Sequence, residues 1–180
     1  MSVKSYLYLV VLFGLCGSTN VNPCYAQFET DSAAPIEITA DSMEWLNEKK
    51  IAIARGNADA IQGRYTLRAQ VLTAHITEDS GNEQESNSQI SLIEAEGDVL
   101  LITPTEEARG NTGTYDVRRK TATLIGSVIL TQGDNVLHGE KLVMNLVTGH
   151  SRLDGDRDPT ETNSSGRVKA IFNPETAEQR

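Results

Sequence analysis

The sequence has few cysteines, few aromatic residues and no long hydrophobic run after its N-terminal segment. Its two cysteines are Cys16 and Cys24, and aromatic residues make up 5% of the chain. If the N-terminal segment is removed, the remaining protein has no cysteine, which excludes disulfides, thiol chemistry and thiolate metal ligands. Its stability must then come from a hydrophobic core.

Positive charge is also scarce. The chain has 16 Lys and Arg residues against 25 Asp and Glu residues, a formal net charge of −9. An acidic protein is repelled by nucleic acid, and its overall field does not attract phosphate groups. We therefore expect no nucleic-acid partner, and an anionic ligand would have to be held mainly through an apolar part.

The N-terminal segment has the features of a secretory signal. Lys4 is followed by an apolar stretch at residues 6–15, and Cys24-Tyr25-Ala26 places small residues at −3 and −1 of a cleavage point. The apolar stretch is shorter than the roughly 17–25 residues of a membrane-spanning helix, so an uncleaved anchor is the weaker alternative. We expect a signal peptide at residues 1–26, cleavage after Ala26, and export.

The remaining chain has the size of one domain. About 154 residues can bury close to 70% of the surface that the unfolded chain exposes. We expect one domain over residues 27–172 and a C-terminal tail over residues 173–180. A polar, acidic stretch at residues 78–89 cannot join a core and predicts a mobile loop.

Small residues recur at regular intervals and indicate an internal repeat. The intervals alternate between about 13 and 16 residues, except for one that contains the acidic stretch, so the repeat is about 29 residues long. The markers are Ala40, Gly56, Ala69, Gly97, Gly110, Gly126, Gly139 and Gly155. Glycine within a strand pattern predicts a bulge or bend. Residues 47–50, 62–64, 118–120 and 132–135 carry turn signals and predict turns between the strands.

Between these markers the side chains alternate between apolar and polar, which is the signature of β-strands. The absence of a sustained three-and-four spacing argues against helices. The apolar positions predict one inward face, which is either a closed core or the lining of a groove: Met43, Trp45, Leu72, Ile76, Val99, Leu101, Tyr115, Val117, Val128, Leu130, Leu142, Met144 and Leu146.

Several segments carry a family resemblance. They are Pro35-Ile36-Glu37-Ile38-Thr39-Ala40-Asp41-Ser42, Ile53-Ala54-Arg55-Gly56-Asn57-Ala58, and residues 108–116, 124–133, 139–142 and 166–172. Together they resemble the LptA/OstA-type periplasmic lipopolysaccharide transport proteins. The resemblance covers residues 35–172, and it depends on the order and spacing of motifs that are individually weak.

The resemblance implies an all-β fold, a twisted open β-jellyroll (OstA-like) of stacked antiparallel strands. It also implies a periplasmic carrier that binds the lipid A acyl chains of lipopolysaccharide in a groove lined by the inward residues named above. Its partners would be the inner-membrane-anchored and outer-membrane transport components with related jellyroll domains. End-to-end homo-oligomers would form through strand edges that include Ile36, Ile38, Val168, Ala170 and Phe172.

Other functional classes have less support. His75, His138 and His150 are scattered, no serine lies in a nucleophile-elbow motif, and we expect no catalysis and no cofactor. Asp154, Asp156 and Asp158 lack the closing glutamate of an EF-hand, so we expect no metal site there. A glycan-active enzyme would need two carboxylates in one cleft, and the alternating pattern predicts none on the apolar face. A structural assembly protein that pairs by strand addition, with a sealed core, remains the main alternative.

Overall fold

The computed structural model describes residues 34–78, 88–156 and 166–173. The predicted signal peptide and most of the acidic stretch lie outside the described residues. The strands are β1 (Ile36–Thr39), β2 (Ser42–Leu46), β3 (Ile51–Gln62), β4 (Tyr65–Glu78), β5 (Ser88–Ile102), β6 (Glu107–Asp116), β7 (Thr121–Gln132), β8 (Asn135–Asn145), β9 (Ser151–Asp154) and β10 (Lys169–Ile171). A 3-10 helix, Asn47–Lys49, joins β2 to β3.

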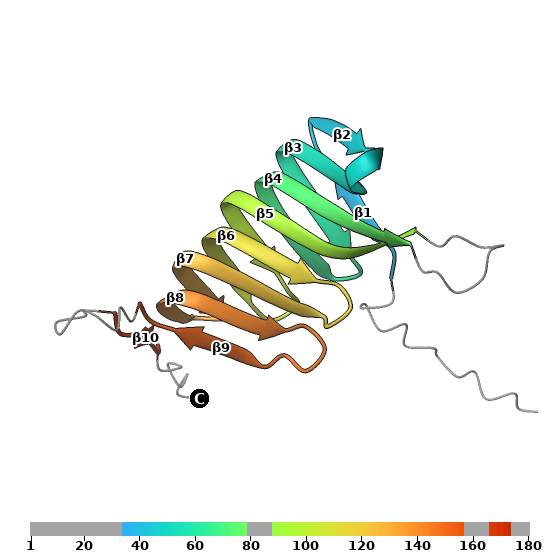
Figure 1. The fold of residues 1–180 in the computed structure, drawn as a ribbon. Coiled ribbons are helices and arrows are strands. Elements are labelled where there is room, and N and C mark those ends of the chain that lie inside the picture. Colours follow the sequence, from blue (N-terminus) through green and yellow to red (C-terminus); the bar gives the residue numbers. More distant parts are fainter. Residues whose placement is uncertain (1–33, 79–87, 157–165, 174–180) are drawn as a thin grey trace, which may run out of the picture.

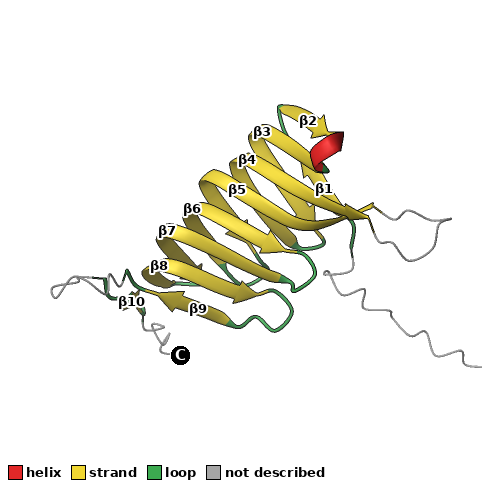
Figure 2. Ribbon diagram, in the orientation of Figure 1, coloured by secondary structure: helices red, strands yellow, loops and turns green. Residues whose placement is uncertain are grey.

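These strands form one ten-stranded antiparallel sheet whose neighbours follow chain order from β3 to β8 (Figure 1). At one end, β1 and β2 both pair with β3, and at the other end β9 and β10 both pair with β8. Figure 2 shows that almost all of the described chain is strand or tight turn. The all-β prediction is confirmed, whereas the repeat length stays a prediction.

Glycine-containing bulges bend β3, β5 and β7 in the middle. The pairing register shifts between Arg55 and Ala58 in β3, and equivalent shifts occur in β5 and β7. Each shift contains a glycine and a following residue with positive φ, for example Gly97 (79°) and Asp98 (50°) in β5. A left-handed backbone is easiest for glycine, which explains the residue at the first position. The predicted bends at Gly56, Gly97 and Gly126 are confirmed.

The bulges divide the sheet into two arms. The first arm contains β1, β10 and the parts of β3 to β8 near the turns at residues 63–64, 103–106 and 133–134. The second arm contains β2, β9 and the parts of β3 to β8 on the other side of the bulges. Polar side chains bridge the corner between the arms, including Gln70, whose Nε2 donates to Oδ2 of Asp98 at 2.7 Å.

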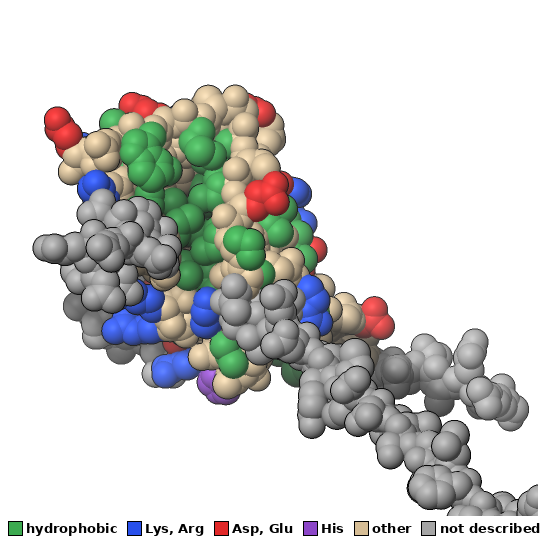
Figure 3. All heavy atoms as spheres, turned by 90° about the vertical axis from the view of Figure 1, so that its right-hand side faces the viewer, with side chains coloured by type: hydrophobic (Ala, Val, Ile, Leu, Met, Phe, Trp, Pro, Cys, Tyr) green, Lys and Arg blue, Asp and Glu red, His purple; other side chains and the backbone are tan. Residues whose placement is uncertain are grey.

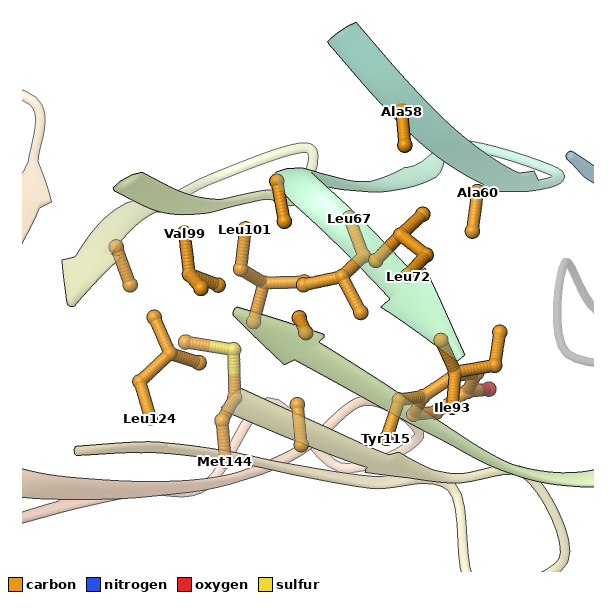
Figure 4. Packing of buried hydrophobic residues seen from close by; sticks show 14 of the residues in the cluster. Ala58, Ala60, Leu67, Leu72, Ile93, Val99, Leu101, Tyr115, Leu124 and Met144 are labelled. Atoms are coloured by element: carbon orange, nitrogen blue, oxygen red, sulfur yellow. The ribbon is translucent and has the colours of Figure 1, made fainter. Parts of the chain in front are cut away.

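The inner faces of the two arms pack together and form the core (Figure 4). Alanines occupy many inner positions of β3, β4 and β5, and larger side chains fill the space between the arms. Complete burial of one leucine side chain contributes about 1.5–3 kcal/mol. The largest side chains that are fully buried are Leu72, Ile93, Leu124, Leu142, Val99 and Val128.

The ends of the acidic stretch differ from the prediction. Glu78 pairs with Ser88, and Thr77 pairs with Gln89, so the first and last residues of the predicted loop extend β4 and β5. Backbone pairing does not depend on an apolar side chain, which is why a polar composition alone misplaced these strand ends. The turns predicted at residues 62–64, 118–120 and 132–135 are confirmed.

Candidate functional site

The candidate site is the apolar space between the two arms and the seam where the arm ends meet. The seam is the line along which the turns of the first arm meet the turns of the second arm, on the side of the molecule opposite the bulges. Figure 3 looks toward this side of the molecule and shows hydrophobic side chains gathered in a hollow along the stack of strands. An apolar surface that is continuous over several strands suits an elongated apolar ligand.

Among the described residues, at least three hydrogen bonds cross the seam. Tyr115 Oη at the end of β6 donates to Oε1 of Gln62 at the end of β3, at 2.7 Å. Tyr65 Oη donates to the carbonyl oxygen of Leu146, also at 2.7 Å. Farther along, Ser151 Oγ donates to Oε2 of Glu106 at 3.0 Å. Each bond joins the first arm to the second and thus holds the seam closed.

A small cavity lies behind the first two of these bonds. Its volume is about 20 Å³, roughly enough for one water molecule. Except for Gln62, its lining is formed by apolar and aromatic side chains: Ile36, Ala60, Gln62, Tyr65, Leu67, Ile93, Leu101, Tyr115 and Leu146. The interior is therefore packed in this structure, and the cavity is its opening toward the seam.

Burial affects the pKa of Tyr115, which forms a hydrogen bond with the buried amide of Gln62. Burial, with smaller contributions from the neighbouring Tyr65 and from the negative charge of Asp116, raises the pKa of Tyr115 to about 12. The phenol thus stays protonated at neutral pH and acts as a donor. Gln62 is the only buried polar residue of the described chain, and its Nε2 also donates to the carbonyl oxygen of Ala34 at 2.8 Å. The amide therefore links β1, β3 and β6.

Most of the predicted inward residues lie on this inner face. Two are partly buried against the core, Ile76 and Val117. The following nine are buried: Leu72, Val99, Leu101, Tyr115, Val128, Leu130, Leu142, Met144 and Leu146. Three of the nine, Leu101, Tyr115 and Leu146, line the cavity.

Met43 and Trp45 depart from the predicted enclosure. They lie opposite Ala54 and Ala52 in the pairing of β2 with β3, so they point to the inner face. They are nevertheless 55% and 57% exposed. Because β2 pairs on one side only within the described residues, no neighbouring strand covers them. They form an exposed apolar end of the roll.

The predicted partner edges are at the two ends of the sheet. Ile36 and Ile38 of β1 are partly buried against the core, and their strand pairs with β3. At the other end, Ala170 lies opposite Leu137 of β8, while Val168 and Phe172 beside it are exposed. In the described part of the chain, β1 and β10 are the outermost strands of the first arm.

The sequence indicated Tyr115 as an inward residue but did not indicate Gln62 and Tyr65, which also close the seam. Gln62 fell in a turn signal, although it follows Ala58 and Ala60 at the period of two that marks the inner face. Tyr65 has the same relation to Leu67, two residues later. The period could have placed both side chains inward, but their partners lie 53 and 81 residues away in the chain.

The turns that border the seam carry positive side chains despite the acidic composition. Arg64 lies in the turn between β3 and β4, and Arg118, Arg119 and Lys120 lie in the turn between β6 and β7. Arg119 pairs with Asp116 at 3.3 Å. A net charge does not predict such a local arrangement, because it sums residues that are far apart in space.

Metal binding and membrane insertion would require other structural features. The described residues contain no group of three or more His, Cys, Asp or Glu side chains placed to hold a metal ion. In the same part of the chain, no helix has the length and apolarity to cross a membrane. His75 pairs with Glu94 at 2.9 Å, where both side chains are accessible to solvent.

Comparisons with known proteins agree with this architecture. An uncharacterized protein of Rhizobium meliloti (strain 1021) is 30% identical over 143 residues, which are 79% of this chain and 73% of the relative. The crystal structure of LptH from Pseudomonas aeruginosa, titled the LptA-homologous periplasmic component of a lipopolysaccharide transport device, has a similar fold. Its TM-score is 0.65 and its identity 21%, and the match covers 80% of this chain and 99% of that chain.

The sequence profile of a protein family matches residues 37–150, which include all of β2 to β8. The family is described as the LptA/(LptD N-terminal domain) lipopolysaccharide transport proteins. The match covers more than half of the chain, including both arms and the seam. The chain therefore belongs to the LptA/LptD N-terminal domain family of lipopolysaccharide transport proteins.

Proposed function

We propose that this protein is a periplasmic carrier that binds the acyl chains of lipid A between its two arms. It would pass lipopolysaccharide from the inner-membrane complex to the outer-membrane assembly complex. The observation that carries the proposal is the unbroken apolar inner face from β3 to β8 in a chain of this transport family. Each acyl methylene removed from water contributes about 0.8 kcal/mol, so several chains supply ample affinity.

The arrangement separates the two parts of an amphiphile. Acyl chains would lie between the arms, where apolar side chains replace water around them. Sugars and phosphates would remain outside the seam, near the turns that carry Arg64 and Arg118. This division explains how an acidic protein could hold an anionic lipid, because the overall charge opposes the headgroup while the interior binds the chains.

The ends of the sheet would join the carrier to its partners. Strands with one unpaired side accept another strand through backbone hydrogen bonds. Components at the inner and outer membranes with related jellyroll domains, or further copies of this chain, would stack on these ends. Met43 and Trp45 would then be covered by the neighbouring domain, and the apolar inner face would continue from one domain to the next.

A binding measurement tests the lipid part of the proposal. The purified protein should bind lipopolysaccharide and should not bind the same glycolipid after chemical removal of its acyl chains. Retained binding of the deacylated molecule would show that the headgroup is recognised instead. Absence of binding to both would favour the alternative, a structural assembly protein, which the nearly complete packing of the interior supports.

A further inference from the structure

The hydrogen bonds across the seam differ from all others that hold the arms. The ladder pairs of the sheet run from strand to strand within the first arm or within the second arm, on either side of the bulges. The bond from Tyr115 to Gln62 and the bond from Tyr65 to Leu146 instead join one arm to the other. Separation of the arms would break these two bonds and the bond from Ser151 to Glu106, and it would leave every ladder pair intact.

The described residues around the cavity behind the seam leave no room for an acyl chain there. The cavity behind the seam has a volume of about 20 Å³, enough for roughly one water molecule. The side chains around it are almost fully buried, including Ile93 at 1% and Leu101 at 2% exposure. An acyl chain of many methylenes therefore needs a second arrangement of the arms, in which the seam is open.

We propose that Gln62, Tyr65 and Tyr115 form a gate that holds the arms together until an acyl chain replaces the apolar contacts between them. The inference rests on the proposed function, which supplies the acyl ligand. Packing of the apolar interior does not by itself require these three polar residues. The gate gives them a role.

The position of the gate supports this role. Tyr65 and Tyr115 line the cavity, so their hydroxyls lie where a chain entering from the seam would first meet the interior. Both acceptors are neutral, a side-chain amide and a backbone carbonyl. Loss of one neutral hydrogen bond shifts an equilibrium by about 2- to 10-fold. Such a gate is strong enough to favour the closed form and weak enough to open.

The first test measures opening without a ligand. The predicted mature chain has no cysteine, so Ala60→Cys at the cavity gives a single thiol reporter. Tyr65→Phe and Tyr115→Phe each remove one hydroxyl and keep the ring. In these variants the thiol should react with a maleimide about 2- to 10-fold faster. The matched control Thr114→Val, which removes a hydroxyl from the exposed outer face, should leave the rate unchanged.

A second reporter separates gate opening from general loosening. Ala69→Cys lies next to the corner, where it is 3% exposed and pairs with Ala58 beside the bulge of β3. Its labelling should not change in the tyrosine variants. Equal acceleration at both reporters, or no acceleration at Ala60→Cys, would overturn the gate.

The final experiment uses fluorescently labelled lipopolysaccharide and the full mature protein. The tyrosine variants should bind it with association rates raised by the same factor as the labelling rates. Faster labelling with an unchanged association rate would overturn the gate but leave the proposed function standing. If neither the wild-type protein nor the variants bind lipopolysaccharide, the proposed function fails, and the gating role fails with it.

Discussion

The bulge of β7 offers a stringent test of how the sequence creates two arms. Gly126 has a φ of +89°, and an added Cβ would lie 2.9 Å from Cβ of Asn111. Alanine at this position costs about 1–2 kcal/mol for the left-handed backbone and about 1–3 kcal/mol for the steric conflict. Gly126→Ala should therefore lower the free energy of unfolding by about 2–5 kcal/mol, measured by urea denaturation and far-UV circular dichroism.

Gly133 provides the matched control. It lies in the turn between β7 and β8 with a φ of +55°, and an added Cβ would meet nothing within 4 Å. Gly133→Ala should thus show the backbone cost alone, about 1–2 kcal/mol. If the two variants lose the same stability, the close approach of Asn111 at the corner does not contribute, and the steric part of the expected loss is refuted.

Three further predictions concern the core, the buried phenol and the exposed end. Leu124→Ala, at a side chain that is 0% exposed, should cost about 2–5 kcal/mol in urea denaturation; a loss under 1 kcal/mol would contradict the packing described for the core. Because folding raises the pKa of Tyr115 from 10.0 to about 12, its stabilising contribution is complete below pH 10 and is lost as pH rises toward 12. Tyr115→Phe should lack this loss in denaturation curves between pH 9 and roughly 12, and an identical pH profile would disprove it. The double variant Met43→Ser and Trp45→Ser should change the unfolding free energy by under about 1 kcal/mol, since both side chains are exposed, but should weaken self-association in sedimentation velocity. Unchanged self-association would remove this end from the proposed interface.

Much of the fold could be predicted from local patterns in the sequence. The period of two identified the inner face, and the glycines at 56, 97 and 126 marked the bulges, because both features depend on backbone geometry within one strand. The turns were predictable for the same reason. The ends of the acidic stretch were not, since the pairing of Glu78 with Ser88 extends the ladder regardless of polarity.

The candidate site was harder to predict because it depends on distances between arms. A period gives the direction of Tyr115, but only the fold brings it to Gln62, 53 residues earlier in the chain. Likewise, the pattern gave Met43 the same inward direction as Leu142, while the structure buries Leu142 and exposes Met43 at the end of the sheet. The sequence pattern shows which side chains of a strand point inward. The position of that strand in the sheet determines whether those side chains are buried.

Site-specific photocrosslinking in living cells can determine whether lipopolysaccharide acyl chains lie between the arms. A photoreactive phenylalanine derivative at Tyr115 places the probe at the cavity, and the same residue at the exposed neighbour Thr114 is the matched control. We expect lipopolysaccharide adducts at Tyr115 and none at Thr114. Folded, exported protein without adducts at Tyr115, or with equal adducts at both positions, would contradict it.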